Sequence, residues 1–394
     1  MNIQSILAIN LLKSVGSIAL AIGILLAMVT VHEFGHYVVG KLLNFKITEF
    51  SVGFGPAIFK KRSKKSGELF ALRIVPLGGY CAFDGAAEYE EEQETEAEEK
   101  PQEEQKEQEE QEEYPEPKGE RFNDQAPWKR ILVLVAGATM NYLLALLLLV
   151  VMFAGIGRPV YSVVVEKPEQ TAAVAVQTDI SEQGLQTGDR ILKINGKGVY
   201  LITDYLDALS GEKAGAEIPV LVSANGELIT RTLVLAADAN FANMSDTQTL
   251  LKAMNIYGLY TVTESQGFFP SIGHSFVYSI KIGGTVLRSL GELLTGKLGI
   301  NAMGGPVTTI SMTAQAASSG LMSFLNIAAF IGVNLAVFNL LPVPALDGCK
   351  VIFCLIEWIR KKPVNRKIET IINLVGIIFL FGFAILVDLL QLFI

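Results

Sequence analysis

Long runs of apolar residues dominate the chain, and four of them are long enough to cross a membrane. They cover about 18–39, 131–156, 321–341 and 371–394. A helix needs roughly 20 apolar residues to span the hydrocarbon core of a bilayer. The pattern therefore predicts a polytopic α-helical membrane protein with four transmembrane helices.

The segments between these runs follow other patterns. Residues 46–84 contain short β-rich stretches punctuated by Gly and Pro, which predicts a membrane-associated β-hairpin. Residues 160–236 alternate apolar and polar positions around glycine-containing turns, which predicts one compact β-rich domain. Residues 271–298 have apolar side chains at helical spacing, interrupted by charges, so we expect an amphipathic helix on the outer membrane surface. A fifth transmembrane helix in this segment is the alternative.

These patterns divide the chain into consecutive parts. In order, we expect a first transmembrane helix (1–45), the β-hairpin (46–84), a cytoplasmic insert (85–126), a second transmembrane helix (127–157), the β-rich domain (158–240), a segment with the amphipathic helix (241–319), a third transmembrane helix (320–360) and a fourth (361–394).

Composition supports this organisation. Half of the 394 residues are hydrophobic and the mean hydropathy is +0.39, which excludes an ordinary soluble protein. The net charge of −8 is unevenly distributed, because residues 88–116 contain sixteen Glu and two Lys and contribute −14. The remainder is therefore about +6 by subtraction. The acidic stretch has little apolar surface to bury, so we expect it to be disordered. Three cysteines are too few for a disulfide framework.

The distribution of cations predicts the orientation. Cytoplasmic loops of membrane proteins are enriched in Lys and Arg. Two such clusters flank the predicted spans: Lys41, Lys46, Lys60, Lys61, Arg62, Lys64, Lys65, Lys129 and Arg130, and then Arg360, Lys361, Lys362, Arg366 and Lys367. Both loops are expected in the cytoplasm, which leaves the termini and the β-rich domain outside it.

The first apolar run contains the sequence His32-Glu33-Phe34-Gly35-His36. Ionisable residues are costly inside a membrane and usually mark a function. On a helix, His32 and His36 lie one turn apart on the same face, where they can bind one metal ion. Glu33 lies beside them, placed to handle the proton of a catalytic water. The pattern predicts a metal-dependent hydrolase with its active site in the bilayer.

A catalytic zinc needs a third protein ligand. Asp347 is the outstanding candidate, because the predicted orientation places it at the inner end of span three, at the depth of His32 and His36. Prolines end the helix before it, and Gly348 allows a sharp turn. His274 is expected on the opposite side of the membrane. Glu357, on an otherwise apolar run, is the alternative third ligand.

The two metal motifs, His32 to His36 and residues 339–348 (NLLPVPALDG), resemble those of the site-2 protease family of intramembrane zinc metalloproteases. The bacterial branch that regulates sigma-factor signalling is most similar. Other resemblances follow in the family's order: 50–56 and 76–80 to its membrane re-entrant β-loop, 128–142 to its second span, 184–196 to its PDZ domain, and 304–307 to a turn before its third span. The chain departs from the family pattern at Ala138, Ala345 and Cys349, none of which is a predicted ligand.

The resemblance implies a zinc protease of the bacterial plasma membrane that cleaves transmembrane segments of single-span proteins, such as anti-sigma factors or remnant signal peptides. It implies Zn²⁺ held by His32, His36 and Asp347, with Glu33 as the catalytic residue and Asn339 in contact with the substrate. An extracytoplasmic PDZ-like domain would receive a peptide C-terminus. The lipid bilayer would surround the spans. Nucleic acid is not expected to be a partner.

Two other interpretations remain open at this point. One is a membrane zinc protease of another family, in which Glu357 completes the site. The other is a membrane scaffold whose PDZ-like domain binds peptides and whose metal site is vestigial.

Overall fold

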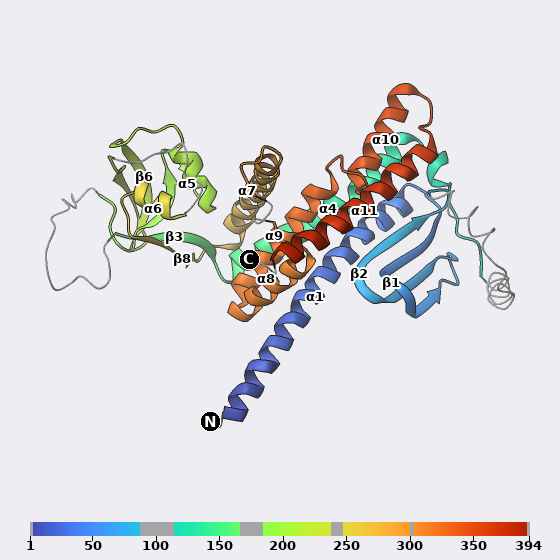
Figure 1. Ribbon diagram of the computed structural model, residues 1–394, viewed down its shortest axis with the longest axis horizontal. Coiled ribbons are helices and arrows are strands. Elements are labelled where there is room, and N and C mark those ends of the chain that lie inside the picture. Colours follow the sequence, from blue (N-terminus) through green and yellow to red (C-terminus); the bar gives the residue numbers. More distant parts are fainter. Residues whose placement is uncertain (1–2, 87–113, 166–183, 238–246, 300–302, 392–394) are drawn as a thin grey trace. The chain divides into compact units, whose positions relative to one another are not determined.

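The computed structural model describes residues 3–86, 114–165, 184–237, 247–299 and 303–391 (Figure 1). The acidic stretch that we expect to be disordered falls mostly at 87–113, outside the described residues. The chain forms two compact units. The first comprises Met1–Leu148 with Val286–Ile394, and the second comprises Leu149–Thr285.

Helices make up most of the first unit. They are α1 (Ile3–Leu42), α4 (Pro127–Gly155), α8 (Pro306–Ser319), α9 (Leu321–Asn339), α10 (Asp347–Arg360) and α11 (Arg366–Gln391), with a short 3₁₀ turn η1 (Phe122–Asp124) before α4. The last turns of α4 belong to the second unit.

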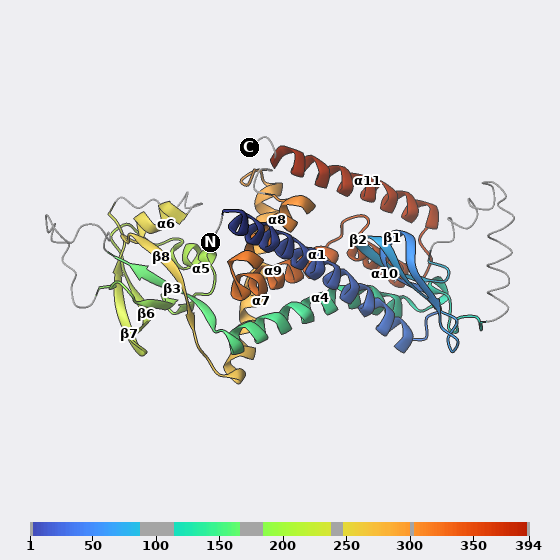
Figure 2. The same cartoon turned by 90° about the horizontal axis from the view of Figure 1, so that it is seen from below.

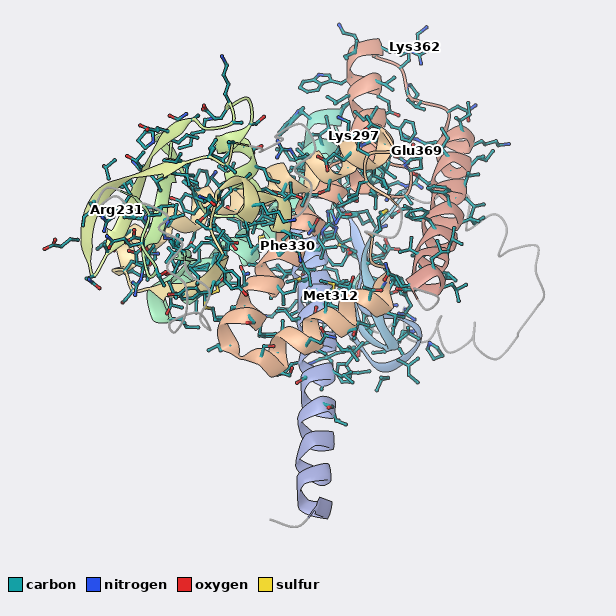
Figure 3. All side chains as sticks on the ribbon, turned by 60° about the vertical axis from the view of Figure 1, so that its left-hand side comes forward. Arg231, Lys297, Met312, Phe330, Lys362 and Glu369 are labelled. Atoms are coloured by element: carbon teal, nitrogen blue, oxygen red, sulfur yellow. The ribbon has the colours of Figure 1, made fainter. Side chains whose placement is uncertain are left out.

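Among the described residues, four helices are long and apolar enough to cross a membrane: α1 from Ser14 onward, α4, α9 and α11. The four predicted apolar helices are thus confirmed. Large apolar side chains such as Phe330 on α9 are exposed, as lipid contact requires. By contrast, Lys362 in the loop before α11 and Glu369 at the start of α11 carry charge (Figure 3). The helix over 268–294 is not among these four.

Helices α1 and α4 cross in close contact (Figure 2). A Cβ atom added at Gly35 would lie 2.5 Å from the carbonyl oxygen of Ala136, so the two backbones approach closely only because Gly35 has no side chain. Small residues allow such approaches between membrane helices, where the hydrophobic effect does not drive association. Met28 of α1 also packs against Ala328 and Ile331 of α9.

The predicted hairpin forms from β1 (Ile47–Arg62) and β2 (Leu69–Phe83). Each strand folds back at its middle, so that Phe50 pairs with both Cys81 and Phe70, while Ala57 pairs with Arg73. The segments therefore lie in the order 79–83, 47–52, 69–73 and 57–62. Gly53 and Gly78, at the folds, have positive φ angles that favour glycine.

Polar and aromatic contacts hold this folded hairpin together and join it to α1. The guanidinium of Arg73 donates hydrogen bonds to Ser51, Glu49 and the hydroxyl of Tyr80. Tyr37 of α1 packs edge-on against Phe50, with ring centroids 5.6 Å apart. The hairpin is thereby fixed beside the same end of α1 that carries the histidines.

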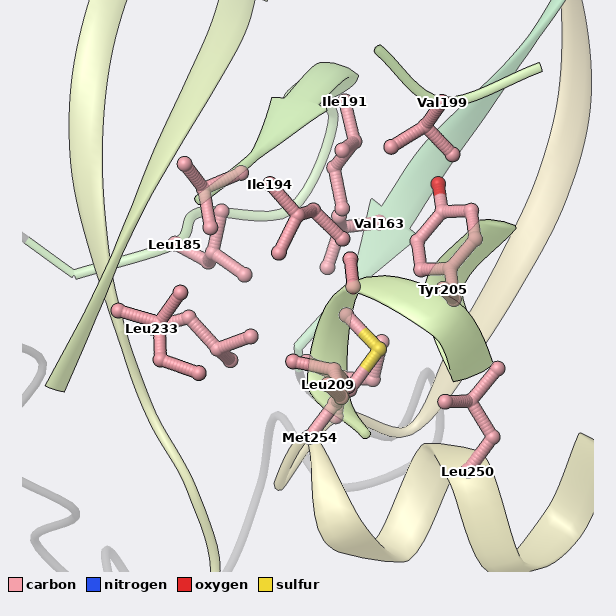
Figure 4. Packing of buried hydrophobic residues seen from close by; sticks show 14 of the residues in the cluster. Val163, Leu185, Ile191, Ile194, Val199, Tyr205, Leu209, Leu233, Leu250 and Met254 are labelled. Carbon is pink, nitrogen blue, oxygen red and sulfur yellow. The ribbon is translucent and has the colours of Figure 1, made fainter. Parts of the chain in front are cut away.

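The second unit contains a six-stranded antiparallel sheet with the order β7-β6-β4-β3-β8, and β5 pairs with β4. The strands are β3 (Arg158–Val164), β4 (Arg190–Ile194), β5 (Lys197–Gly198), β6 (Glu217–Ala224), β7 (Glu227–Val234) and β8 (Gly258–Glu264), and the helices are α5 (Ile202–Leu209), α6 (Thr247–Ala253) and the first part of α7 (Phe268–Leu294). Figure 4 shows α5 and Tyr205 packed into the apolar core.

The sheet continues beyond the boundary expected at position 240. Strand β8 pairs along its whole length with β3, and Leu250 and Met254 belong to the same buried core as Ile194. Sequence periodicity could not place this boundary, because the pairing of β8 with β3 joins segments that are about a hundred residues apart. Within the core, Asp189 is paired with Arg231, whose position on β7 is labelled in Figure 3.

Replacing Gly35 by Ala tests the α1–α4 crossing. The new methyl group would meet the Ala136 carbonyl, and we expect the loss of about 1–3 kcal/mol that overpacking usually costs. Gly23→Ala on the same helix is the matched control, because no atom lies within 4 Å of its added Cβ and alanine favours helices. Thermal unfolding in detergent should show a lower midpoint for Gly35→Ala only. Equal midpoints for the two variants would contradict the crossing.

Candidate metal centre

Three side chains from two helices bring their donor atoms together. Nε2 of His32 and Nε2 of His36, both on α1, lie 3.2 Å apart. Oδ2 of Asp347, the first residue of α10, lies 3.1 Å from the former and 3.2 Å from the latter. The three predicted ligands therefore form a nearly equilateral triangle, although more than three hundred residues separate Asp347 from the histidines.

This triangle fits a zinc ion. Ligands placed tetrahedrally at about 2.0–2.1 Å from zinc lie roughly 3.3 Å from one another. Hydrogen bonds alone do not account for the geometry. A neutral His36 that donates from Nδ1 has no proton on Nε2, so its Nε2 cannot donate to Asp347. His32 has at most one proton on Nε2, which can serve either His36 or Asp347 but not both. Two imidazoles and one carboxylate are also a common ligand set of catalytic zinc.

The loop after α9 directs Asp347 toward the histidines. Helix α9 ends at Asn339, and α10 begins at Asp347. In between, Pro344 packs closely on Gly376 of α11, and the side-chain oxygen of Asn373 accepts a hydrogen bond from the amide of Ala345. Ala345 has a φ of +75°, which the ring of a proline cannot adopt. The departure from the family pattern at this position thus matches the local backbone.

Helix α4 supports the histidines from the other side. Nδ1–H of His36 donates to the carbonyl oxygen of Val133 at 2.8 Å. This bond leaves Nε2 of His36 free to bind a metal. One turn further along, Gly137 lies against both imidazole rings, where any side chain would collide with them.

The hairpin lies beside Glu33. A Cβ atom at Gly79 would be 3.3 Å from Cγ of Glu33, so the segment 79–83 reaches the acidic residue next to the metal ligands. This segment is an edge of the folded hairpin, since among the described residues it pairs on one side only, with 47–52. An edge strand beside the site offers unpaired backbone groups to an extended peptide.

The remaining candidate residues are not members of the donor triangle. Both carboxylate oxygens of Glu357 are used: one by Arg130, the other by Arg366 at 3.0 Å and the amide of Val364 at 2.9 Å. Asn339 is partly buried at the last position of α9. His274 belongs to the second unit, where its Nδ1 lies 2.8 Å from the hydroxyl oxygen of Tyr200, and its burial and the nearby Arg158 lower its pKa.

Sequence analysis did not identify the residues of α4 that contact the histidines. A backbone carbonyl such as that of Val133 leaves no trace in the residue type. Asn141, which lies one turn beyond Gly137 and near His32, did leave a signal, because it is a polar residue within an apolar run.

The comparisons with known proteins agree with this centre. Residues 20–383 match the model of peptidase family M50. The zinc metalloprotease RasP of Bacillus licheniformis is 27% identical to the chain, over 90% of this chain and 93% of the relative. The regulator of sigma-W protease RasP of Bacillus subtilis is 26% identical, over 90% and 92%. The chain therefore belongs to peptidase family M50, the site-2 protease family, and is a zinc metalloendopeptidase.

Proposed function

We propose that this protein is an intramembrane protease that hydrolyses peptide bonds in the transmembrane segments of single-span membrane proteins. The observation that carries the proposal is the donor triangle of His32, His36 and Asp347, two of whose members lie on a helix apolar enough to cross a membrane. These three residues hold the zinc. A site at this position in the helix meets substrates that are themselves in the bilayer.

The chemistry divides between the metal and Glu33. Zinc, when bound, polarises the scissile carbonyl and acidifies a water molecule. Glu33 takes the proton of that water as general base and then delivers it to the leaving amine. Glu33 is partly buried, and Gly79 of the hairpin lies against its side chain, so its carboxylate is partly shielded beside the donor triangle.

The hairpin presents the substrate. A helical substrate hides its carbonyl groups in hydrogen bonds, so it must be held extended before attack. The edge segment 79–83, beside Glu33, can pair with an unwound peptide by strand addition. Asn339, by resemblance to the family, contacts the substrate backbone.

The orientation follows from the cationic loops. The hairpin and the loop between α10 and α11 lie in the cytoplasm, as the positive-inside rule favours, and the metal centre faces that side. The β-rich domain is a PDZ-like module on the extracytoplasmic side. Helix α7 lies on the outer membrane surface: Tyr278 packs on Phe153 in the last turn of α4, while Phe269 and Ile280 are exposed.

The PDZ-like module selects substrates by receiving a peptide C-terminus that an earlier cleavage has exposed. The name of the Bacillus subtilis relative assigns that protein to sigma-W regulation. Anti-sigma factors and remnant signal peptides are accordingly the proposed substrate classes for this chain in the bacterial plasma membrane.

Cleavage of a co-expressed single-span reporter tests the proposed activity. We expect the unchanged protein to cleave within the reporter's apolar segment, and Glu33→Gln to lower the rate by at least about a hundredfold through loss of the general base. Immunoblotting and mass spectrometry of the fragments measure this. A scaffold with a vestigial metal site predicts the same reporter pattern for both proteins, and cleavage by Glu33→Gln would refute the proposal.

Zinc retention distinguishes Asp347 from Glu357. Asp347→Ala removes one of three donors, so we expect a large loss of zinc from the purified protein. Glu357→Gln should keep its zinc, because both oxygens of Glu357 serve Arg130, Arg366 and Val364. Elemental analysis after dialysis against a weak chelator reports both results. Retention by Asp347→Ala together with loss from Glu357→Gln would favour the other zinc-protease family.

Site-specific photocrosslinking tests the hairpin edge. A photoreactive phenylalanine analogue at Ala82, on the edge segment 79–83, should crosslink to the reporter in a Glu33→Gln background. The same analogue at Phe59 is the control, because Phe59 lies in segment 57–62 at the opposite edge. Crosslinks of similar yield from both positions would show that substrates do not pair with the edge beside Glu33.

A further inference from the structure

One face of α4 lies against both histidine rings. Val133, Gly137 and Asn141 follow one another at intervals of four residues, so they lie on the same face of the helix. The carbonyl of Val133 accepts the Nδ1 proton of His36, and Gly137 leaves space for both rings. Asn141 occupies the equivalent position beside His32: its side-chain nitrogen lies 3.4 Å from Nδ1 of His32.

The amide of Asn141 as placed does not match a zinc-binding His32. When His32 binds a metal through Nε2, its ring is neutral and carries the proton on Nδ1. Nδ1–H is a donor, and so is the amide NH₂ that faces it. At the same time Oδ1 of Asn141 is buried without a hydrogen-bond partner in the described part of the chain, and Asn141 is only 1% exposed. A buried acceptor left unpaired costs about 1–3 kcal/mol.

A half-turn of the amide removes this mismatch. The oxygen and nitrogen of an Asn side chain have nearly the same shape, and their assignment depends on the hydrogen bonds they make. After the half-turn, Oδ1 faces Nδ1–H of His32 and accepts its proton. The orphaned oxygen then has a donor, and two donors no longer face each other.

We propose that Asn141 is a positioning residue for the zinc site, whose side-chain oxygen accepts the Nδ1 proton of His32. The proposal rests on the metal ligands proposed above. The hydrogen bond fixes the tautomer and the orientation of the ring, so that Nε2 of His32 points into the donor triangle. His36 and His32 are thus held in the same way by positions two turns apart on α4, one by a backbone carbonyl and the other by a side-chain oxygen. Outer partners of this kind often change metal affinity by about 10–100-fold.

The zinc affinity of two Asn141 variants tests the direction of this hydrogen bond. Leu has a similar size but no acceptor, so Asn141→Leu should weaken zinc binding about 10–100-fold. Asp can only accept, so Asn141→Asp should bind zinc at least as tightly as the unchanged protein. The dissociation constants come from competition with a chromogenic chelator on the full-length protein in detergent. The absorption bands of bound Co²⁺ report the ligand geometry independently of activity.

Asn334→Leu is the matched control. It replaces another asparagine of a predicted span, whose side chain, within the described residues, bonds only to the Phe330 carbonyl of its own helix, and it should leave zinc affinity unchanged. If Asn141 instead donated to Nδ1 of His32, Asn141→Asp would lose affinity as severely as Asn141→Leu, and the proposal would be overturned. A lower unfolding temperature for both Asn141 variants with unchanged zinc affinity would reduce Asn141 to helix packing and also overturn it.

The same assay separates this inference from the proposed function. His36→Ala removes a ligand and should lose zinc whatever Asn141 does. If His36→Ala keeps its zinc, the proposed metal site is wrong. If His36→Ala loses zinc while Asn141→Leu binds as tightly as the unchanged protein, the metal site stands and the role of Asn141 is wrong. Should Asn141→Leu fail to fold, Asn141→Asp alone decides the direction of the hydrogen bond.

Discussion

The close crossing of α1 and α4 at Gly35 is the constraint on which the metal centre depends. Polar groups inside a membrane are costly unless other protein groups satisfy them. At this crossing the rings of His32 and His36 reach the backbone of α4, where Val133 and Gly137 receive them. A wider separation of the two helices would leave the imidazoles without partners in an apolar surrounding. The helix contact is therefore also the condition for a defined metal geometry.

The proposed third ligand depends on a separate set of contacts. Asp347 begins α10, and the far part of α10 is tied to α4 by the buried pair of Glu357 and Arg130, each only 4% exposed. Removing one partner of such a pair usually costs about 3–5 kcal/mol, because a buried charge remains alone. Helix α4 thus contacts the histidine pair through one face and anchors the helix of Asp347 near its own N-terminus. Glu357, a rival ligand on sequence grounds, is part of this support.

The folded hairpin brings a strand edge to the side chain of Glu33. Its two strands fold back on themselves at glycines, and Arg73 ties the folded segments together. This folding turns segment 79–83 into an edge beside Glu33. Backbone groups at an edge can accept an unwound peptide.

The order of residues determined the local features of this protein. Apolar runs of sufficient length defined four helices, and the spacing of His32 and His36 placed two donors on one face, because helical periodicity is a local property. The predicted orientation then pointed to Asp347 as a third ligand, and resemblance to a family implied zinc. The tertiary structure decided what depends on distant contacts. Strand β8 pairs with β3 beyond position 240, and Glu357 forms ion pairs with two arginines. Val133, Gly137 and Asn141 of α4 contact the histidines. Sequence could not show these, since packing between helices and strands joins residues whose separation along the chain carries no periodic signal.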